Sequence, residues 1–516
     1  MSTRRWYSAL WVRIAGPRTV LNPTRPPRSV GCASWRGLRT LPAVDDCSRA
    51  RLRYSIELKR GFQLLLSILQ EPQLGRQLKE IVLDRTPSFT WRGKSSYSIQ
   101  PTKAVVTADD LQRLQRAIRD IGIRDGDEQA KVLNMLLQDF DFFEHWKTGL
   151  FYRAQALATL LISVGQVEKL AFGPCGKGST DADLVFHNYL HRMAASREPT
   201  ALRNLRHVRF LPDSDSIYED PTEYSEYDIY DCLNLVRKLP SIESVRFDAM
   251  TLGREPGVWP PPRSANYTDI MLCRCIIPDE RDLSIIISSS KKLKRFTYTV
   301  GGRYESDPSS VRSRPILQSL LLHHETLEDL NLDIQGHTST DEMFDESPMD
   351  YDPTRLTDDW EQEEYEAHWA DELEELALHE QQRSREPPVP CMLRSLSRLK
   401  HLSIGGHLLY CYARGFGAGV REPFSLVDYL PPSLESLRIY GYGSEDPDGR
   451  LPDIGLGIQV AKLLEEKAQK LPLLSVIEGL DTPIPHGQSI CNVDDDEGEA
   501  LVWRRMDDEW VQGDAD

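Results

Sequence analysis

The sequence predicts an α/β fold made of repeated helix-strand units. Three observations support this: an apolar phrase of the form L-x-x-L-x-L recurs along the chain, its spacing is nearly regular, and helix-like stretches precede its copies. The phrase reads Leu78, Ile81, Leu83; Val167, Leu170, Phe172; Leu205, Val208, Phe210; Ile242, Val245, Phe247; Leu293, Phe296, Tyr298; Leu327, Leu330, Leu332; Leu399, Leu402, Ile404; and Leu434, Leu437, Ile439. This pattern is typical of a leucine-rich-repeat solenoid, or horseshoe.

The spacing of the phrases is the first test of a repeat. Their first residues lie 89, 38, 37, 51, 34, 72 and 35 residues apart. Four of these seven intervals fall between 34 and 38, and the long ones contain segments of different composition, as insertions in repeat proteins do. We therefore expect one solenoid over residues 54–480, with a helical insert at 107–164 and an acidic insert at 341–386.

Apolar stretches with helical spacing supply the other half of each unit. They cover residues 62–69, 154–162, 184–193, 229–236, 283–287, 316–322 and 460–464. One helix-strand unit cannot bury its apolar face alone. Stacked units are expected to form a continuous core, with parallel strands on the concave side and helices outside.

The helical insert shows its own start signal. Thr107 and Asp110 form a capping box, and apolar residues then recur at helical spacing. A second helix is predicted over 129–140 and a third over 145–162. The aromatic residues between Phe140 and Trp146 are interpreted as core packing between these helices.

Charge is concentrated in three segments of a chain whose net charge is -17. Residues 1–60 hold 13 basic and 3 acidic residues, residues 341–386 hold 3 and 18, and residues 494–516 hold 2 and 10. Residues 1–53 are predicted to be a basic, disordered segment. Their Arg-rich sequence, free of acidic residues up to Val44, is also typical of a mitochondrial transit peptide, so both interpretations stay open.

The two acidic segments are predicted to lie outside the packed core. In the insert, residues 347–359 are expected to be disordered and residues 360–382 to form an exposed acidic helix. Residues 481–516 are predicted to be an acidic, disordered C-terminal tail.

The scattered cysteines point to a reducing compartment, and the absence of long apolar runs argues against a membrane span. Nine cysteines are scattered along 516 residues, and Cys273 and Cys275 have no second Cys or His pair at zinc-finger spacing. We expect buried thiols, no metal and no cofactor. No uncharged apolar run reaches the length of a membrane span, so we expect no membrane association. The expected location is cytoplasmic or nuclear, with mitochondria as the alternative.

Two Gly-rich stretches resemble nucleotide-binding motifs but lack required residues or sequence context. In the Gly-rich stretch 173–180, Ser179 stands where a phosphate-binding loop needs its lysine. The stretch 415–419 lacks the context of a dinucleotide site. His323 and His324, at the end of a predicted helix, are interpreted as structural. We therefore predict no catalytic residues and no enzymatic activity.

Residues between the apolar positions of each phrase must point outward and form two rows on the concave face. One row reads Val82, Ala171, Arg209, Arg246, Thr297, Asn331, Ser403 and Arg438, and the other reads Glu80, Lys169, His207, Ser244, Arg295, Asp329, His401 and Ser436. The middle repeats thus place His207, Arg209, Arg246 and Arg295 together as a candidate partner-binding patch. Ordinary solvated strand residues are an equally good reading of the same positions.

The chemistry of the candidate patch indicates an acidic protein partner. Arginine recognises carboxylates through its planar fork of donors. Nucleic acid is disfavoured as the anion because the net charge of -17 and the acidic tail would repel phosphate. The partner is therefore expected to offer an acidic segment, and the insert at 341–386 is itself a candidate occupant of the patch.

Several phrases resemble the degenerate repeats of filamentous-fungal F-box and leucine-rich-repeat proteins. The resemblance rests on residues 74–83, 202–210, 327–332 and 396–404 and covers roughly residues 54–480. It implies a substrate-recognition subunit of a cullin-type ubiquitin ligase, with ligase components as partners. The region before Tyr54 offers only Leu41-Pro42 of the expected F-box pattern.

Together, these observations predict a non-enzymatic protein-protein interaction scaffold that binds partners on the concave repeat face. Its specific form would be a ubiquitin-ligase adaptor. A mitochondrial leucine-rich-repeat protein is the alternative.

Overall fold

A computed structural model describes the chain in segments. These are residues 12–13, 52–55, 58–83, 106–137, 156–173, 185–196, 202–212, 224–253, 257–301, 311–338, 393–415, 424–442, 455–487, 502–506 and 509–513. The chain forms two compact units, here called unit 1 (residues 1–259 and 264–267) and unit 2 (residues 260–263 and 268–516). Each unit is described by itself.

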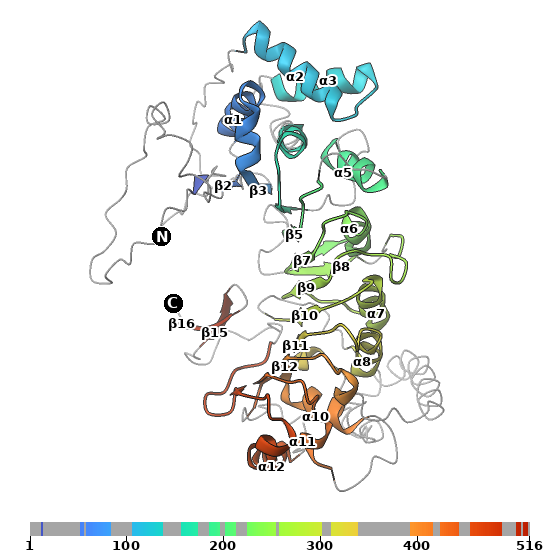
Figure 1. The fold of residues 1–516 in the computed structure, drawn as a ribbon, viewed down its shortest axis with the longest axis vertical. Coiled ribbons are helices and arrows are strands. Elements are labelled where there is room, and N and C mark those ends of the chain that lie inside the picture. The colour runs from blue at the N-terminus through green and yellow to red at the C-terminus, as the bar shows by residue number, and fades with distance from the viewer. Residues whose placement is uncertain are drawn as a thin grey trace, which may run out of the picture. The chain divides into compact units, whose positions relative to one another are not determined.

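Unit 1 consists of parallel strands that alternate with helices (Figure 1). Its elements are β1 (Val12–Arg13), β2 (Leu52–Ser55), α1 (Leu58–Gln70), the 3-10 helix η3 (Pro72–Gln77), β3 (Leu78–Leu83), α2 (Ala108–Asp120), α3 (Gly126–Leu137), an unlabelled helix over 156–164, β4 (Lys169–Phe172), α5 (Val185–Ala195), β5 (His207–Phe210), β6 (Ser225–Tyr227), α6 (Ile229–Val236), β7 (Ser244–Asp248) and β8 (Met250–Leu252). Strands β2, β3, β4, β5 and β7 pair in that order, all parallel. β1 pairs antiparallel with β2, and β6 pairs with β8.

Unit 2 has the same alternation of parallel strands and helices. Its elements are β9 (Asp269–Cys273), α7 (Glu280–Ser289), β10 (Arg295–Thr299), α8 (Ser313–Leu321), β11 (Asp329–Asp333), the 3-10 helices η5 (Gln335–His337) and η7 (Leu393–Ser395), β12 (His401–Gly405), α10 (Gly406–Arg414), α11 (Leu426–Tyr429), β13 (Ser436–Tyr440), α12 (Leu456–Lys470), β14 (Val476–Glu478), β15 (Val502–Met506) and β16 (Glu509–Gly513). Strands β9 to β14 pair in sequence order, all parallel, and β15 pairs antiparallel with β16.

The repeated phrase explains why each strand forms and which face it buries. In β5, Val208 and Phe210 are buried while His207 and Arg209 are partly exposed, and the same alternation recurs in β10, β11, β12 and β13. Except for Leu78, which opens β3, the first residue of each phrase precedes its strand by two residues. Leu205, in that position, is completely buried. Every copy of the phrase therefore contributes to the core, as the sequence predicts.

Helices pack their apolar stripe onto one side of these strands. In unit 2, α7 and α8 run along the same side of β9, β10 and β11 (Figure 1). α7 buries Leu283, Ile286 and Ile287, which are three and four residues apart. The helix-strand alternation thus encloses a core between the sheet and its helices.

The 51-residue interval between Ile242 and Leu293 does not contain an insertion. It contains another strand, β9, which pairs with β10 in register, Ile270 opposite Phe296 and Leu272 opposite Tyr298. The phrase is present there as Tyr267, Ile270 and Leu272. A further strand, β14, follows β13 and pairs Ile477 with Leu437. The prediction of a single, lengthened repeat was therefore wrong at this place. The interval holds two repeats, and tyrosine fills the first leucine position of the second one.

The segment 107–164 is helical in the parts that the structure describes. The Thr107 hydroxyl accepts a hydrogen bond from the Asp110 N–H at 3.1 Å and caps α2. Gln70 of α1 donates to Asp110 at 2.9 Å, so the capping residue also joins α2 to α1. The second predicted helix is α3, and the third is present from residue 156 onwards. The aromatic residues from Phe140 to Trp146 lie outside the described residues.

An aromatic row runs through the core of unit 1. The Phe210 ring lies 5.0 Å from the Phe172 ring and 4.8 Å from the Phe247 ring, measured between centroids. These residues occupy the same position in β4, β5 and β7. Neighbouring repeats within unit 1 thus contact one another through aromatic side chains, edge-on between Phe172 and Phe210 and stacked between Phe210 and Phe247.

A row of ion pairs follows the starts of the strands. Lys79 pairs with Glu168 at 3.0 Å and Arg206 pairs with Glu243 at 3.3 Å in unit 1. In unit 2, Lys400 pairs with Glu435 at 3.0 Å. Such exposed pairs contribute roughly 0–1 kcal/mol each, so they add little to stability.

The basic segment 1–53, apart from strands β1 and β2, lies outside the described residues. The acidic insert 341–386 lies wholly outside them. Of the C-terminal tail, residues 481–487 are described, together with the backbone of β15 and β16.

Candidate functional site

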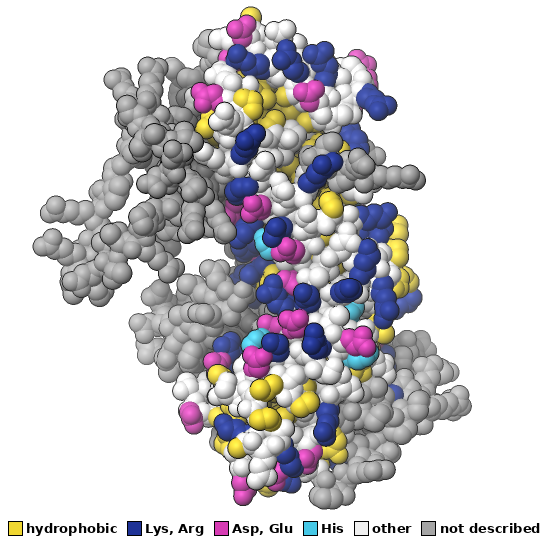
Figure 2. Space-filling view, in the orientation of Figure 1, with side chains coloured by type: hydrophobic (Ala, Val, Ile, Leu, Met, Phe, Trp, Pro, Cys, Tyr) yellow, Lys and Arg dark blue, Asp and Glu magenta, His cyan; other side chains and the backbone are white. Residues whose placement is uncertain are grey.

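The outward positions of the strands form two rows in each unit, as the sequence places them. In unit 1, the first row is Lys169, His207 and Ser244, and the second row is Ala171, Arg209 and Arg246. In unit 2, the first row is Asp269, Arg295, Asp329, His401 and Ser436, and the second is Met271, Thr297, Asn331, Ser403 and Arg438. Basic and acidic side chains are intermixed on the face that Figure 2 shows.

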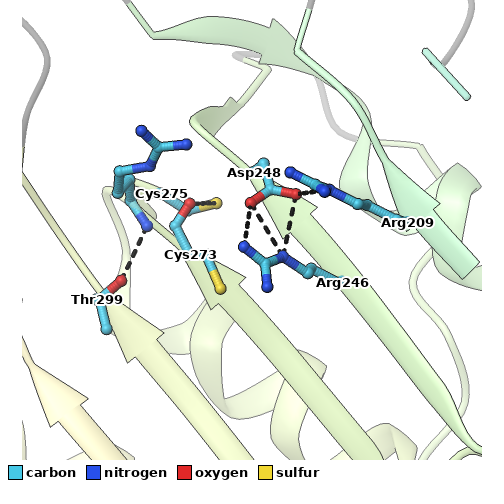
Figure 3. Close-up of polar contacts among 7 residues, drawn as sticks. Arg209, Arg246, Asp248, Cys273, Cys275 and Thr299 are labelled. Carbon is cyan, nitrogen blue, oxygen red and sulfur yellow. Dashed lines mark hydrogen bonds and ion pairs between the residues drawn. The ribbon is translucent and has the colours of Figure 1, made fainter. Parts of the chain in front are cut away.

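The candidate site in unit 1 centres on one buried carboxylate between two arginines (Figure 3). Asp248, at the end of β7, is only 1% exposed. Arg246, two residues earlier, donates through Nε at 3.0 Å and through Nη2 at 2.8 Å to Oδ1. Arg209 of β5 donates through Nε to Oδ2 at 2.5 Å. Asp248 thus fixes both guanidinium groups that the sequence predicts to be neighbours.

Two guanidinium groups share one carboxylate, so the cluster keeps a net charge of about +1. Arg209 uses only its Nε in this contact, and its side chain is 39% exposed. Among the described residues, none accepts a hydrogen bond from its terminal nitrogens Nη1 and Nη2. A carboxylate or phosphate could therefore approach a fork of donors whose orientation is already held.

His207 lies two residues before Arg209 and on the same side of β5. Its Nδ1 and the Ser244 hydroxyl share a hydrogen bond of 2.8 Å. This contact orients the imidazole ring at the edge of the arginine cluster. Lys169 lies on the next strand, β4, in register with His207. The outward face of β4, β5 and β7 thus places a lysine and a histidine beside the cluster.

Arg295, the fourth predicted residue, has a carboxylate of its own. It lies in unit 2 on β10 and pairs with Asp269 of β9, a buried residue in the same row. The hydrogen bond to Asp269 raises the pKa of the Arg295 guanidinium further. Its charge is therefore offset, which lowers the positive charge that the sequence assigns to the patch. Sequence reasoning missed Asp269 because it missed β9.

The contacts around His207 have a second copy in unit 2. His401 Nδ1 and the Ser436 hydroxyl share a hydrogen bond of 2.9 Å. The local sequences agree as well: Ser-Ile-Glu-Ser-Val-Arg-Phe at 241–247 matches Ser-Leu-Glu-Ser-Leu-Arg-Ile at 433–439. In this copy Arg438 pairs with Glu478 at 2.6 Å. The repeat therefore preserves a polar surface pattern in addition to its core.

One further difference separates the two copies. Asp329 stands in unit 2 where Lys169 stands in unit 1, next to the histidine in the first row. Burial raises the pKa of the Asp329 carboxyl, although His401 and Arg295 act in the opposite direction. The face of unit 2 thus combines an acidic and a basic group where unit 1 presents bases.

His323 has a structural role, as the sequence indicates. It is buried, its Nε2 lies 3.1 Å from the Ile287 carbonyl oxygen, and its Nδ1 lies 3.4 Å from the Leu293 N–H. It therefore joins the end of α7 to the turn before β10. Burial lowers the pKa of this imidazole.

We expect the buried His323 to make stability pH-dependent. Its folded-state pKa lies below the unfolded value of about 6.5, so the unfolded chain binds the proton first as the pH falls. The free energy of unfolding should decrease below about pH 6.5, by at most about 1.4 kcal/mol per pH unit from this group. Urea titrations of the wild type and His323→Gln between pH 5 and 8 measure this. Equal slopes for both proteins would contradict the assignment.

The cysteines of the described residues are buried, and none of them forms a disulfide with another described cysteine. Cys273 and Cys275 lie at the end of β9, and the Cys275 Sγ is 3.5 Å from the Cys273 carbonyl oxygen (Figure 3). Within the described segments, no group of three or more His, Cys, Asp or Glu side chains could hold a metal ion. Most of the Gly-rich stretches 173–180 and 415–419 lies outside those segments.

No protein-family model matches this chain, and no curated protein matches its sequence. None of the helices in the described part of the chain has the length and apolar character that a membrane span requires.

Proposed function

We propose that this protein is a non-enzymatic interaction scaffold, a leucine-rich-repeat solenoid that binds a protein partner through the outward rows of its strands. The observation that carries the proposal is the cluster of Arg209, Arg246 and Asp248. The buried carboxylate holds Arg209 through Nε and leaves its outer donors at the surface. The supporting context is a set of parallel strands whose outward side chains are polar and partly exposed in both units.

The partner is proposed to contribute an acidic peptide. A carboxylate would accept two hydrogen bonds from the terminal nitrogens of Arg209 and would gain from the nearby Lys169. Nucleic acid fits less well. The cluster carries a net charge of about +1 only, while a nucleic-acid surface needs several unneutralised cations along the backbone. The acidic insert 341–386, or an acidic segment of the partner, is the proposed occupant.

The specific form that we propose is a substrate-recognition subunit of a cullin-type ubiquitin ligase. Its support is the resemblance of the repeats to F-box and leucine-rich-repeat proteins. Affinity purification of the full chain with a C-terminal tag tests this form by the recovery of cullin and its adaptor. Recovery of other proteins alone, through an Arg209-dependent contact, would leave the scaffold without a ligase role.

Replacing Arg209 should weaken the binding of an acidic peptide. We expect Arg209→Ala to raise the Kd of a fluorescent peptide of residues 355–382 about tenfold, equivalent to about 1.4 kcal/mol, because charge-assisted hydrogen bonds are lost. Fluorescence anisotropy on a protein with the insert replaced by a short linker measures this. The intact chain should bind the peptide more weakly, because its own insert competes.

Arg206→Ala is the matched control. Arg206 lies one residue before β5, is more exposed than Arg209 and pairs with Glu243 rather than with Asp248. It should change the Kd less than twofold. The Kd should rise with salt for every variant, since the attraction is between charges at the surface. Equal losses in both variants, or no salt dependence, would contradict recognition by Arg209.

A further inference from the structure

A segment near the C-terminus crosses the carboxyl ends of the strands of unit 2. After β14 the chain turns back, and residues 479–487, here called the strap, contact the ends of β13, β11 and β10 in that order. Ile484 forms a parallel bridge with Tyr440. The strap is thus an extended peptide bound by strand ends, and this location is distinct from the outward rows.

Two glycines anchor the strap. A methyl group on Gly479 would lie 2.1 Å from the Ile439 carbonyl oxygen, and its φ of +92° also favours glycine. A methyl group on Gly487 would lie 2.2 Å from the Val300 carbonyl oxygen. Since these are backbone atoms, any larger residue would push the strap away from its seat.

Hydrogen bonds from two backbone N–H groups complete the attachment, one to a carbonyl oxygen and one to a carboxylate oxygen. Gly441 N–H donates to the Ile484 carbonyl oxygen at 2.7 Å, and Gly487 N–H donates to Asp333 Oδ1 at 2.7 Å. Asp333, the last residue of β11, is completely buried. These bonds recognise the path of a peptide backbone more than its side chains, as in strand addition to a sheet edge.

The strand ends under the strap are also held by contacts of the Gln335 side chain. Gln335 is buried beneath the ends of β12 and β13, and its Oε1 accepts a hydrogen bond from His407 N–H at 3.2 Å. Gly405 and Gly441 both lie against this side chain. Gly441 also holds the strap through its N–H, but the contacts of Gln335 with His407 and Gly405 do not involve residues 479–487, so this part of the floor has a support of its own.

The strap itself buries little. Between its anchors, residues 481–483 are exposed and Ile484 is only partly buried, and the two glycines are its only buried residues. A segment held by a few backbone bonds, without a buried apolar side chain, belongs to the least stable part of a fold. It can therefore open while the sheet stays folded.

We propose that the carboxyl ends of β10, β11 and β13 form a binding groove for an extended, glycine-containing peptide. Residues 479–487 occupy the groove in cis and exchange with a partner peptide of the same kind. The tether gives the strap an effective concentration in the millimolar range, so it holds the groove closed against weak competitors. Opening of the strap would then control access to the groove.

Hydrogen exchange on the full chain tests the opening. The amides of Gly487 and Gly441, whose hydrogen bonds join the strap to the strand ends, should exchange at least tenfold faster than those inside β10 to β13, at conditions far from unfolding. Exchange of the strap only together with the sheet would overturn the proposal, because the strap would then be an inseparable part of the fold.

Peptide binding in trans tests the groove. We expect Gly487→Ala to bind a fluorescent peptide of residues 476–489 at least tenfold more tightly than the wild type, since the tethered strap no longer seats. Gly457→Ala is the matched control, because a methyl group there meets its nearest atom only at 3.9 Å. It should bind like the wild type. A peptide with Gly487→Ala should not bind to any variant.

Two results would overturn the proposal at this stage. The first is Gly487→Ala with exposed strap amides and no gain in peptide binding, which would show that the vacated ends take no peptide. The second is loss of amide protection throughout β10 to β13 in Gly487→Ala, which would make the strap a requirement for folding. Neither result bears on Arg209, so failure here is distinguishable from failure of the proposed function.

Discussion

Replacing Phe210 with alanine should lower the free energy of unfolding by about 3–5 kcal/mol. The side chain is completely buried, and its ring contacts Phe172 and Phe247 on both neighbouring strands. Its removal takes away the transfer free energy of a large apolar group and two aromatic contacts, and leaves a cavity between adjacent repeat units. The shift in the urea midpoint of the full chain measures the effect, with the slope of the transition held in common.

Val258→Ala is the control for this change. Val258 belongs to the same unit and is 77% exposed, so its truncation should change stability by less than about 0.5 kcal/mol. Similar effects of the two substitutions would show that the row of phenylalanines does not make a large contribution to the stability of unit 1.

Replacing Leu272 with alanine should cost about 2–5 kcal/mol in unit 2. Leu272 is completely buried in β9 and lies in register with Tyr298 of β10. This substitution tests whether β9 contributes to the core as the other strands do, since the spacing of the phrases did not predict a strand there. Thermal and urea unfolding of the full chain provide the measurement.

Met271→Ala separates the core contribution from the strand itself. Met271 is the neighbouring residue on β9 but occupies the outward row, where it is partly exposed. It should cost less than half as much as Leu272→Ala, because less apolar area returns to water. Similar costs at both positions would show that β9 does not alternate between core and surface as described.

Much of the fold could be predicted because the apolar residues of the repeated phrase are the residues that form the core. Leu205, Val208 and Phe210 show why. These three buried positions of one repeat are separated by residues that face solvent, so apolar spacing alone locates the strand. The prediction was incomplete where another side chain fills a leucine position. Tyr267 does so before β9, while after β14 a residue without a side chain, Gly479, takes the position that Ile439 has in β13, where the strap requires close backbone approach.

The outward rows could also be predicted, because strand register follows from the same alternation. The partners of the arginines could not. Asp248 follows Arg246 by two residues, yet nothing in a local pattern indicates that it is buried and shared with Arg209, 39 positions away. Asp269 was missed together with its strand. The charge of a surface therefore depends on ion pairs between residues that are far apart in the sequence, and a local sequence pattern does not reveal them.

The ion pairs at the strand starts have a consequence for how such a chain can lengthen. At the starts of β3, β4, β5 and β7 in unit 1, and of β10 to β13 in unit 2, the charges alternate in sign: Lys79, Glu168, Arg206 and Glu243; Lys294, Glu328, Lys400 and Glu435. The smallest block that restores this alternation is two strands long. Gene segments encoding such a two-strand block could be copied or lost without placing like charges side by side, whereas gain of a single strand would break the sequence of signs.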